Sequence, residues 1–268
     1  MLRVEAAGAG RFIGGHSGVS RHRVYGGQFL GQGLMAAANG QAEPARSLHA
    51  YFIRAGTTEL PIEYRTERLA EDCVGVTATQ RDRTIYLMDV LFGPPAPPAV
   101  HAPPRMPDPD RCIPRAEGIR GLPTDTDASW AVADSPFDNR FVENIWERAY
   151  AAPGHNVWFA VPGSAGEPDN VGASVHLQQA ALAYYSDDTI MDNALFPHDW
   201  MQSWQNLQTT SLDHCLWFHA PLDLTRWILH TQDSPVADGG RGMTRGRMYD
   251  KDGTLLASVA QEILMRHP

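Results

Sequence analysis

Residues 47–53, with the sequence SLHAYFI, return in the second half of the chain as residues 211–218, with the sequence SLDHCLWF. Each stretch follows a segment with helical spacing, and each is followed by extended segments that end in a hairpin pattern. A unit that occurs twice in one chain indicates a duplicated domain. Because a site at the junction of two copies needs only one set of catalytic groups, the two copies are free to differ in their polar residues.

The first copy alternates between a helical pattern and extended patterns. Residues 26–39 carry small and apolar residues at helical spacing, and Gly31 and Gly33 within them favour close packing against a sheet. Strands are expected at residues 48–54, 62–69, 74–80 and 84–92. The last two strands flank a short polar turn at residues 81–83, which predicts an antiparallel hairpin.

A proline-rich stretch separates the copies. Residues 94–109 contain eight prolines, which disfavour both a helix and a central strand, and the irregular region extends to about residue 134. In the second copy an apolar stripe from Leu177 to Tyr184 predicts a helix. Strands are expected at residues 137–143, 157–161, 211–218, 227–232, 243–249 and 254–264. The expected division is residues 1–93, a linker at 94–134, and residues 135–268.

Each copy is therefore expected to be a helix packed against an antiparallel sheet. An amphipathic helix must bury its apolar stripe, and a sheet wrapped around the helix does this compactly. This α+β arrangement is the hot-dog fold, so two copies in one chain predict a double hot-dog.

The composition limits the classes of function. With 268 residues and 43% hydrophobic content, the chain allows one large domain or two small ones. A net charge of -9 argues against a nucleic-acid partner. The spacing of Cys73, Cys112 and Cys215 matches no metal motif, and a reduced compartment is expected. Since neither a signal-peptide pattern nor an apolar run of about 18 residues is present, we expect a cytoplasmic protein without membrane insertion.

Several short motifs, in order along the chain, resemble those of the acyl-CoA thioesterase II (TesB-like) family. They are VYGGQ at residues 24–28, LHAYFIR at 48–54, LAYYSD at 182–187, ALFPH at 194–198, LDHCLWFH at 212–219 and ASVAQE at 257–262. The resemblance runs from about residue 12 to the C-terminus and leaves the proline-rich linker and residues 105–135 uncovered. It implies a double hot-dog fold, acyl-CoA as the substrate, no cofactor and association into a homo-oligomer.

The resemblance also implies a set of water-activating residues. The family holds a water against the thioester carbonyl with an Asp, a Thr and a Gln, which fall on Asp187, Ser211 and Gln261. Ser and Thr hydroxyls have the same hydrogen-bonding capacity, but Ser lacks the methyl group that stiffens χ1. The substitution is therefore expected to affect the rate rather than the reaction. Helical geometry alone does not distinguish Asp187 from Asp188.

The chemistry is consistent with these residue types. A thioester is already an activated acyl group, so a positioned water suffices and no covalent nucleophile is required. Asp187 would accept the proton of the water, while Ser211 and Gln261 would orient it. The developing oxyanion needs N–H donors, which the start of a helix supplies. Gly27 and Gln28 of the first copy are the candidates, which predicts a site between the two copies.

Several alternatives remain open at this point. His49 would face the site if its strand has the appropriate orientation, although a structural role is more usual, and His214 and His219 are interpreted as structural hydrogen-bonding groups. The first copy offers Asp89 but no glutamine at the matching hairpin. A protein that binds acyl-CoA without hydrolysing it is the main alternative function. A hydratase or dehydratase would need an Asp/His pair, and Asp187 has no evident histidine partner.

Overall fold

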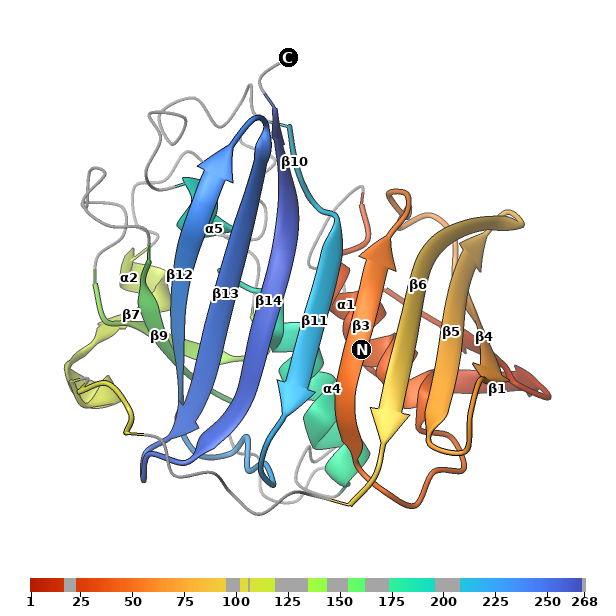
Figure 1. The fold of residues 1–268 in the computed structure, drawn as a ribbon, viewed down its shortest axis with the longest axis horizontal. Coiled ribbons are helices and arrows are strands. Elements are labelled where there is room, and N and C mark those ends of the chain that lie inside the picture. Colours follow the sequence, from red (N-terminus) through yellow and green to blue (C-terminus); the bar gives the residue numbers. More distant parts are fainter. Residues whose placement is uncertain are drawn as a thin grey trace.

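The two repeated stretches, residues 47–53 and 211–218, form neighbouring strands at the centre of one sheet (Figure 1). Strand β3 (Ala45–Phe52) pairs antiparallel with β11 (Asp213–Phe218), with His49 opposite Cys215. The computed structural model describes residues 1–16, 23–94, 102–105, 107–118, 135–143, 154–161, 174–195 and 208–266. The β3–β11 pairing joins the two copies into a continuous sheet, so the duplication seen in the sequence is also the junction of the fold.

The first copy provides helix α1 (Gly26–Ala37) and the strands on one side of this junction. Besides β3, these are β1 (Val4–Gly8), β2 (Arg11–Gly14), β4 (Ile62–Arg68), β5 (Cys73–Gln80) and β6 (Arg83–Phe92). The helix and strands β3 to β6 confirm the elements expected from the sequence, with ends that differ by a few residues. Strands β1 and β2 were not expected, because β1 is largely exposed and lacks an apolar alternation.

The predicted β5–β6 hairpin is present and has a two-residue turn. Gln80 lies opposite Arg83, and the two residues between them, Arg81 and Asp82, have φ values of 49 and 58 degrees. Left-handed backbone at both central positions corresponds to a type I′ turn, whose twist matches that of the flanking strands.

The second copy provides the other side of the sheet. Its strands are β7 (Ile113–Pro114), β8 (Asp138–Phe141), β9 (Asn156–Ala160), β10 (Gln208–Ser211), β11, β12 (Ile228–Asp238), β13 (Arg241–Asp250) and β14 (Leu255–Arg266). Its helices are η1 (Pro109–Arg111), α2 (Arg115–Gly118), α4 (Val175–Ser186) and α5 (Asp192–Leu195). The strand expected at 211–218 is divided at Leu212, whose N–H donates to the Glu262 carbonyl. Ser211 consequently ends a strand of its own.

The stretch interpreted as a wholly irregular linker contains regular structure where it is described. Strand β7 pairs with β8 and forms the edge of the sheet, and η1 and α2 flank it. The prediction of irregular structure to about residue 134 was therefore wrong for residues 109–118. A two-residue strand that includes a proline gives no alternation to detect, and proline is tolerated there because β7 is an edge strand.

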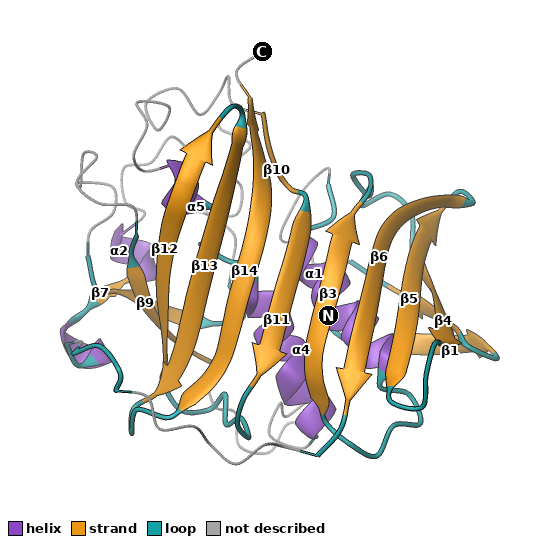
Figure 2. Cartoon of the chain, viewed as in Figure 1, coloured by secondary structure: helices purple, strands orange, loops and turns teal. Residues whose placement is uncertain are grey.

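All strand pairs are antiparallel in the described residues, and the sheet has the order β1-β2-β4-β5-β6-β3-β11-β14-β13-β12-β9-β8-β7, with β10 added against β14. Helices α1 and α4 lie together behind the centre of the sheet, as Figure 2 shows. The structure is the double hot-dog expected from the sequence.

Glycines allow the two long helices to approach closely. A Cβ at Gly27 would lie 2.1 Å from the Tyr184 carbonyl oxygen, and one at Gly31 would lie 2.9 Å from the Ala180 carbonyl oxygen. Gly33, by contrast, faces the sheet, where a Cβ would lie 2.8 Å from Met88 Cε. The expectation of glycine packing against a sheet holds for Gly33, whereas Gly31 packs against the other helix.

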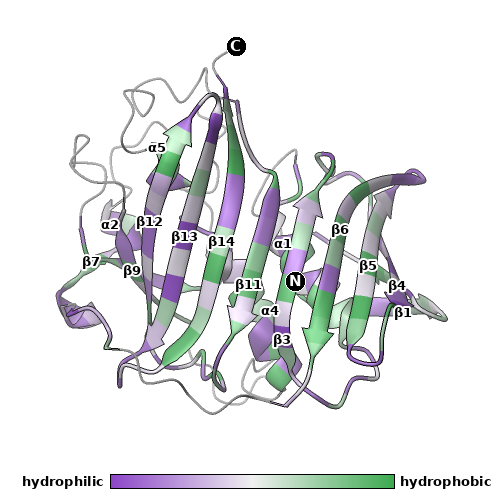
Figure 3. Ribbon diagram, viewed as in Figure 1, coloured by the Kyte–Doolittle hydropathy of each residue, from purple (hydrophilic) through white to green (hydrophobic). Residues whose placement is uncertain are grey.

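Residues of the strands alternate between buried and exposed positions, as in β6. Figure 3 shows the polar and apolar residues that make up these strands. In β6 the side chains of Tyr86, Met88 and Val90 are buried, while Leu87 and Asp89 are exposed. The face toward the helices therefore forms the core, and the opposite face of the first copy is open.

Candidate active site

Three side chains predicted to activate water meet at the junction of the two copies. Ser211 Oγ donates to Asp187 Oδ1 at 3.3 Å, and Gln261 Nε2 donates to Ser211 Oγ at 2.8 Å. Asp187 caps the C-terminus of α4, Ser211 ends β10, and Gln261 lies on β14. These residues are far apart in sequence, and the fold brings them into one hydrogen-bonded chain.

The turn after α4 determines where Asp187 lies. The backbone leaves the helix at Asp187 and reaches Thr189, which has a φ of 64 degrees. This conformation is unusual for a β-branched residue. Gln232 Nε2 donates to Thr189 Oγ1 at 2.8 Å. A buried side-chain hydrogen bond thus helps to hold the tight turn that presents Asp187.

The first copy contributes the opposite wall of the site. The Gly27 N–H donates to the Asp187 carboxylate, and a Cβ at Gly26 would lie 2.6 Å from Asp187 Oδ2. The same Cβ would lie 3.3 Å from Phe52 Cε1. The carboxylate therefore rests against the N-terminus of α1, where the helix dipole favours negative charge. The three side chains predicted to activate water therefore lie where the two copies meet.

The surroundings of Asp187 raise its pKa to about 7. Burial is the main cause, because it disfavours the charged carboxylate, and nearby Asp188 acts in the same direction. Hydrogen bonds from Gln261, Gly27 and Ser211 oppose the rise. A carboxylate with a pKa near neutrality is suited to accept a proton from water and return it.

The structure distinguishes Asp187 from its neighbour Asp188. Asp188 Oδ2 forms an ion pair with Arg115 Nη1 at 3.1 Å, and Asn139 Nδ2 donates to the same oxygen at 3.5 Å. Asp188 is thus engaged by residues of the second copy, while Asp187 contacts Ser211. Sequence spacing alone could not make this distinction.

His214 also belongs to this cluster, although the sequence alone did not connect it with Gln261. It is fully buried, with Nδ1 2.5 Å from Gln261 Oε1 and Nε2 2.8 Å from Ser186 Oγ. Burial lowers its pKa to about 4, so the ring is neutral near pH 7. The interpretation of His214 as a hydrogen-bonding group is confirmed, but its partner is Gln261. Cys215 pairs with Ala260 in the antiparallel β11–β14 pair, and this register brings the adjacent residues His214 and Gln261 together.

Two other predicted residues make contacts of a different kind. His49 is exposed, its Nδ1 lies 3.4 Å from Cys215 Sγ, and its ring contacts Trp217. The Gln28 side chain is buried and donates to the Gly15 carbonyl at 2.5 Å, while its backbone N–H donates to the Tyr25 carbonyl. The expected contribution of His49 is not supported by this position, because its strand directs it to the face of the sheet away from α1 and α4.

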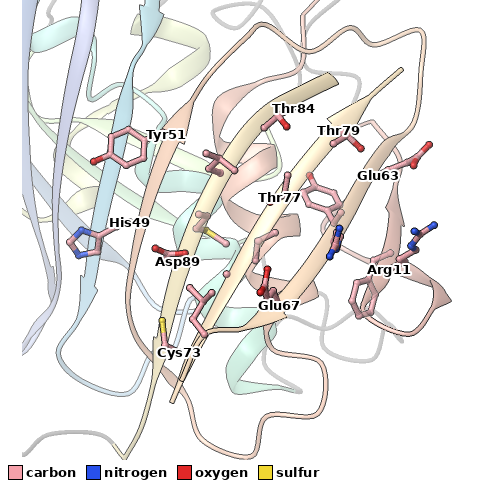
Figure 4. A pocket seen from close by; sticks show the side chains of 18 of the residues that line it. Arg11, His49, Tyr51, Glu63, Glu67, Cys73, Thr77, Thr79, Thr84 and Asp89 are labelled. Carbon is pink, nitrogen blue, oxygen red and sulfur yellow. The ribbon is translucent and has the colours of Figure 1, made fainter. Parts of the chain in front are cut away.

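That open face carries a hollow of about 1290 Å³ over strands β3 to β6. Figure 4 shows His49, Tyr51 and Asp89 along it. Neither Asp187 nor Gln261 lines this hollow. The hollow is thus separate from the cluster of Asp187, Ser211 and Gln261.

The first copy has no matching set of polar groups among the residues that the structure describes. Its long helix has Ala38 at the C-cap where α4 has Asp187. The buried side chains on β6 are apolar, and Asp89 points to the open face. One copy therefore carries the polar cluster and the other supplies the start of α1.

The described residues contain no group of three or more His, Cys, Asp or Glu side chains that could hold a metal. In the same residues no helix has the length and apolar character needed to cross a membrane.

The sheet and its two central helices define the class as a double hot-dog protein, and a carboxyl, a hydroxyl and an amide meet at the junction of the two copies. Residues 16–93 match the model for the N-terminal domain of acyl-CoA thioesterases, and residues 150–264 match the acyl-CoA thioesterase model. The chain belongs to the acyl-CoA thioesterase family.

Individual relatives agree with this assignment. The chain is 30% identical to human acyl-coenzyme A thioesterase 8 over 286 residues, which cover 99% of this chain and 88% of the relative. It is 30% identical to acyl-CoA thioesterase 2 of Haemophilus influenzae over 282 residues, which cover 99% and 96%.

Solved structures are similar over the whole chain. An acyl-CoA thioesterase II from Mycobacterium marinum is 27% identical, with a TM-score of 0.78 and coverage of 100% of this chain and 97% of that one. A hot-dog protein of unknown function from Alicyclobacillus acidocaldarius is 16% identical, with a TM-score of 0.73 and coverage of 100% and 97%. The second likeness concerns the fold alone.

Proposed function

We propose that this protein hydrolyses acyl-CoA to a free acid and CoA by direct attack of a water held by Asp187, Ser211 and Gln261. The observation that carries the proposal is the chain of hydrogen bonds from Gln261 through Ser211 to Asp187. The names of the relatives support acyl-CoA as the substrate.

The three residues divide the work of water activation. Asp187 takes a proton from the water while the water oxygen forms a bond to the thioester carbon, and the carbonyl electron pair moves onto its oxygen. Ser211 and the Gln261 amide hold the water in line with the carbon. When the tetrahedral intermediate collapses, the carbon–sulfur bond breaks and the thiolate of CoA receives the proton from Asp187. One water and one thioester thus give one acid and one thiol.

The start of α1 supports the charged groups of this reaction. Because the Gly27 N–H contacts Asp187 in this structure, its evident role is to fix the carboxylate. The positive end of the helix dipole also favours an oxyanion that develops beside it. We therefore keep Gly27 as the proposed first-copy residue of the site, with Gln28 contributing through its place in the first turn of α1.

The direct test is the Asp187→Asn variant, assayed by thiol release over acyl-CoA substrates of different chain lengths. The amide keeps the size of the carboxyl but cannot accept the proton, so kcat should fall by about 10² or more. Circular dichroism and the midpoint of thermal unfolding should remain close to the wild type. Undiminished turnover by a folded variant would contradict the mechanism.

A second function is favoured by one observation. The Ser211 hydroxyl lies 3.3 Å from Asp187, longer than an ordinary O–H···O bond, and the stiffening methyl of Thr is absent. Such a cluster could bind acyl-CoA without hydrolysing it. Binding of acyl-CoA by the wild type without release of thiol, on every substrate tested, would establish this alternative.

We also propose that the protein is a cytoplasmic homo-oligomer. The open face of the first copy exposes Tyr51, Leu87 and Leu91, with relative exposures of 59%, 38% and 39%. Covering these side chains would favour association of copies. The cysteines Cys73, Cys112 and Cys215 are free thiols, which is consistent with a reducing compartment. Sedimentation of the wild type and of Leu87→Glu tests the oligomer, which the glutamate should weaken.

A further inference from the structure

The polar groups behind Asp187 form a closed ring of hydrogen bonds. On one side Gln261 Nε2 contacts Ser211 Oγ at 2.8 Å, and Ser211 Oγ contacts Asp187 Oδ1 at 3.3 Å. On the other side Gln261 Oε1 contacts His214 Nδ1 at 2.5 Å, and His214 Nε2 contacts Ser186 Oγ at 2.8 Å. Ser186 and Asp187 are consecutive residues, so the backbone closes the ring.

The chemistry of the partners determines where the hydrogen on His214 lies. An amide oxygen can only accept, so the contact with Gln261 Oε1 requires a hydrogen on His214 Nδ1. The ring is neutral near pH 7, because burial lowers its pKa to about 4. The single ring hydrogen is then on Nδ1, and Nε2 carries a lone pair. The Ser186 hydroxyl also lies 2.8 Å from the Ala183 carbonyl oxygen, so its one hydrogen is donated either to that oxygen or to His214 Nε2.

The opposite tautomer would disturb the site. With the hydrogen on Nε2, the Gln261 amide would have to turn so that its NH₂ group faced Nδ1. Its carbonyl oxygen would then face Ser211 and the Asp187 carboxylate, which brings acceptors together. The Ser211 hydrogen would also be drawn to the amide oxygen and away from Asp187. The state of His214 therefore determines which polar atoms Gln261 presents to the reaction.

We propose that His214 is a positioning residue: by donating from Nδ1 to Gln261, it holds the amide with its N–H groups toward Ser211 and Asp187. This role deepens the proposed function and rests on it. His214 would not touch the substrate, so its loss would reduce kcat and leave KM nearly unchanged. The cost of a misplaced amide is about 10²-fold in kcat.

Two polar substitutions at one position provide a matched test. In His214→Asn the side-chain NH₂ group can occupy the place of Nδ1 and keep the donor to Gln261. In His214→Gln the amide group reaches the place of Nε2 and leaves the Gln261 oxygen without its donor. We expect a large fall in kcat for His214→Gln and a much smaller one for His214→Asn. His219→Gln, a histidine of the same region that contacts Ser258 instead, is the control and should behave as the wild type.

A double-mutant cycle separates positioning from a general effect on folding. If His214 acts through Gln261, the His214→Gln substitution should cost little more in a Gln261→Ala background. An equal loss of kcat in both backgrounds, equal losses for His214→Asn and His214→Gln, or a change confined to KM would overturn the proposal.

A measurement on the wild type does not depend on turnover. Nitrogen-15 NMR of the His214 side chain should show a neutral ring with the hydrogen on Nδ1 near pH 7. A hydrogen on Nε2 would overturn the inference even if the enzyme is active. If the wild type hydrolyses no acyl-CoA, the proposed function fails, while the tautomer still reports on the hydrogen-bond ring.

Discussion

Gly26 and Asp187 lie so close together that a Cβ on the glycine would come within 2.6 Å of the carboxylate Oδ2. The glycine belongs to the first copy and the aspartate to the second. Contact with the first turn of α1 is thus a condition for the position of the proposed base. This relationship explains how a copy without its own polar cluster contributes to the site.

Gly26→Ala should reduce activity more than stability. The nearest atom is the end of a side chain, so the carboxylate can move away from the new methyl group at modest cost in folding free energy. A displaced base should lower kcat by about 10²-fold. Gly15→Ala is the matched control, because a Cβ there meets no atom within 4 Å. Steady-state thiol release and thermal unfolding of both variants check the prediction, and equal kcat values for the two variants would count against it.

Ser211 can be tested with one deletion and one addition. Ser211→Ala removes the hydroxyl that contacts both Asp187 and Gln261 and should lower kcat by about 10²-fold. Ser211→Thr keeps the hydroxyl and adds a methyl group that restricts χ1, so its kcat should equal or exceed that of the wild type. Steady-state kinetics of the wild type, Ser211→Ala and Ser211→Thr on one acyl-CoA test both expectations. A Thr variant as slow as the Ala variant would show that the hydroxyl does not position the water.

Asp192 should make the protein less stable as the pH rises. It is 4% exposed, and within the described residues its Oδ2 has no hydrogen-bond partner. Burial, followed by the nearby charge of Asp188, raises its pKa to about 8. The folded protein therefore keeps a proton that the unfolded chain releases, so stability falls between about pH 4 and pH 8 and then levels.

Asp192→Asn removes this titration. Relative to the wild type, the variant should be about 4–6 kcal/mol more favoured at pH 9 than at pH 4, because the pKa shift is about four units. Thermal or urea unfolding at the two pH values measures the difference. A stability difference that does not change with pH would contradict the assignment.

The sequence predicted the elements that have strong patterns. Local patterns were sufficient for three features: the apolar stripe of α4, the alternation of β5 and the turn at residues 81–83. The duplication predicted that the site lies between two copies, and the contact of Gly26 and Gly27 with Asp187 agrees with it.

The remaining features depend on contacts between distant segments. The sequence around Gly31 is the same whether the glycine faces a sheet or a helix. Only the packing of α1 on α4 determines that it faces the helix. His214 and Gln261 become neighbours through the register of their two strands. Asp188 pairs with Arg115, which belongs to a segment whose sequence shows no helix or strand pattern. His49 was predicted to lie near the site because it belongs to the repeated stretch at residues 47–53. The alternation of side chains along β3 directs it to the other face of the sheet.

If Asp187 acts as the base, the ionisation of its carboxyl should control the rate of hydrolysis. With a pKa of about 7, the carboxyl is protonated in acid and ionised in alkali, so kcat/KM should rise with pH through about 7 and then level. The measurement is the pH profile of kcat/KM for thiol release by the wild type and by Asp187→Asn. We expect a limb near pH 7 in the wild-type profile and no such limb in the residual activity of Asp187→Asn. A flat wild-type profile across this range, or the same limb in Asp187→Asn, would contradict it.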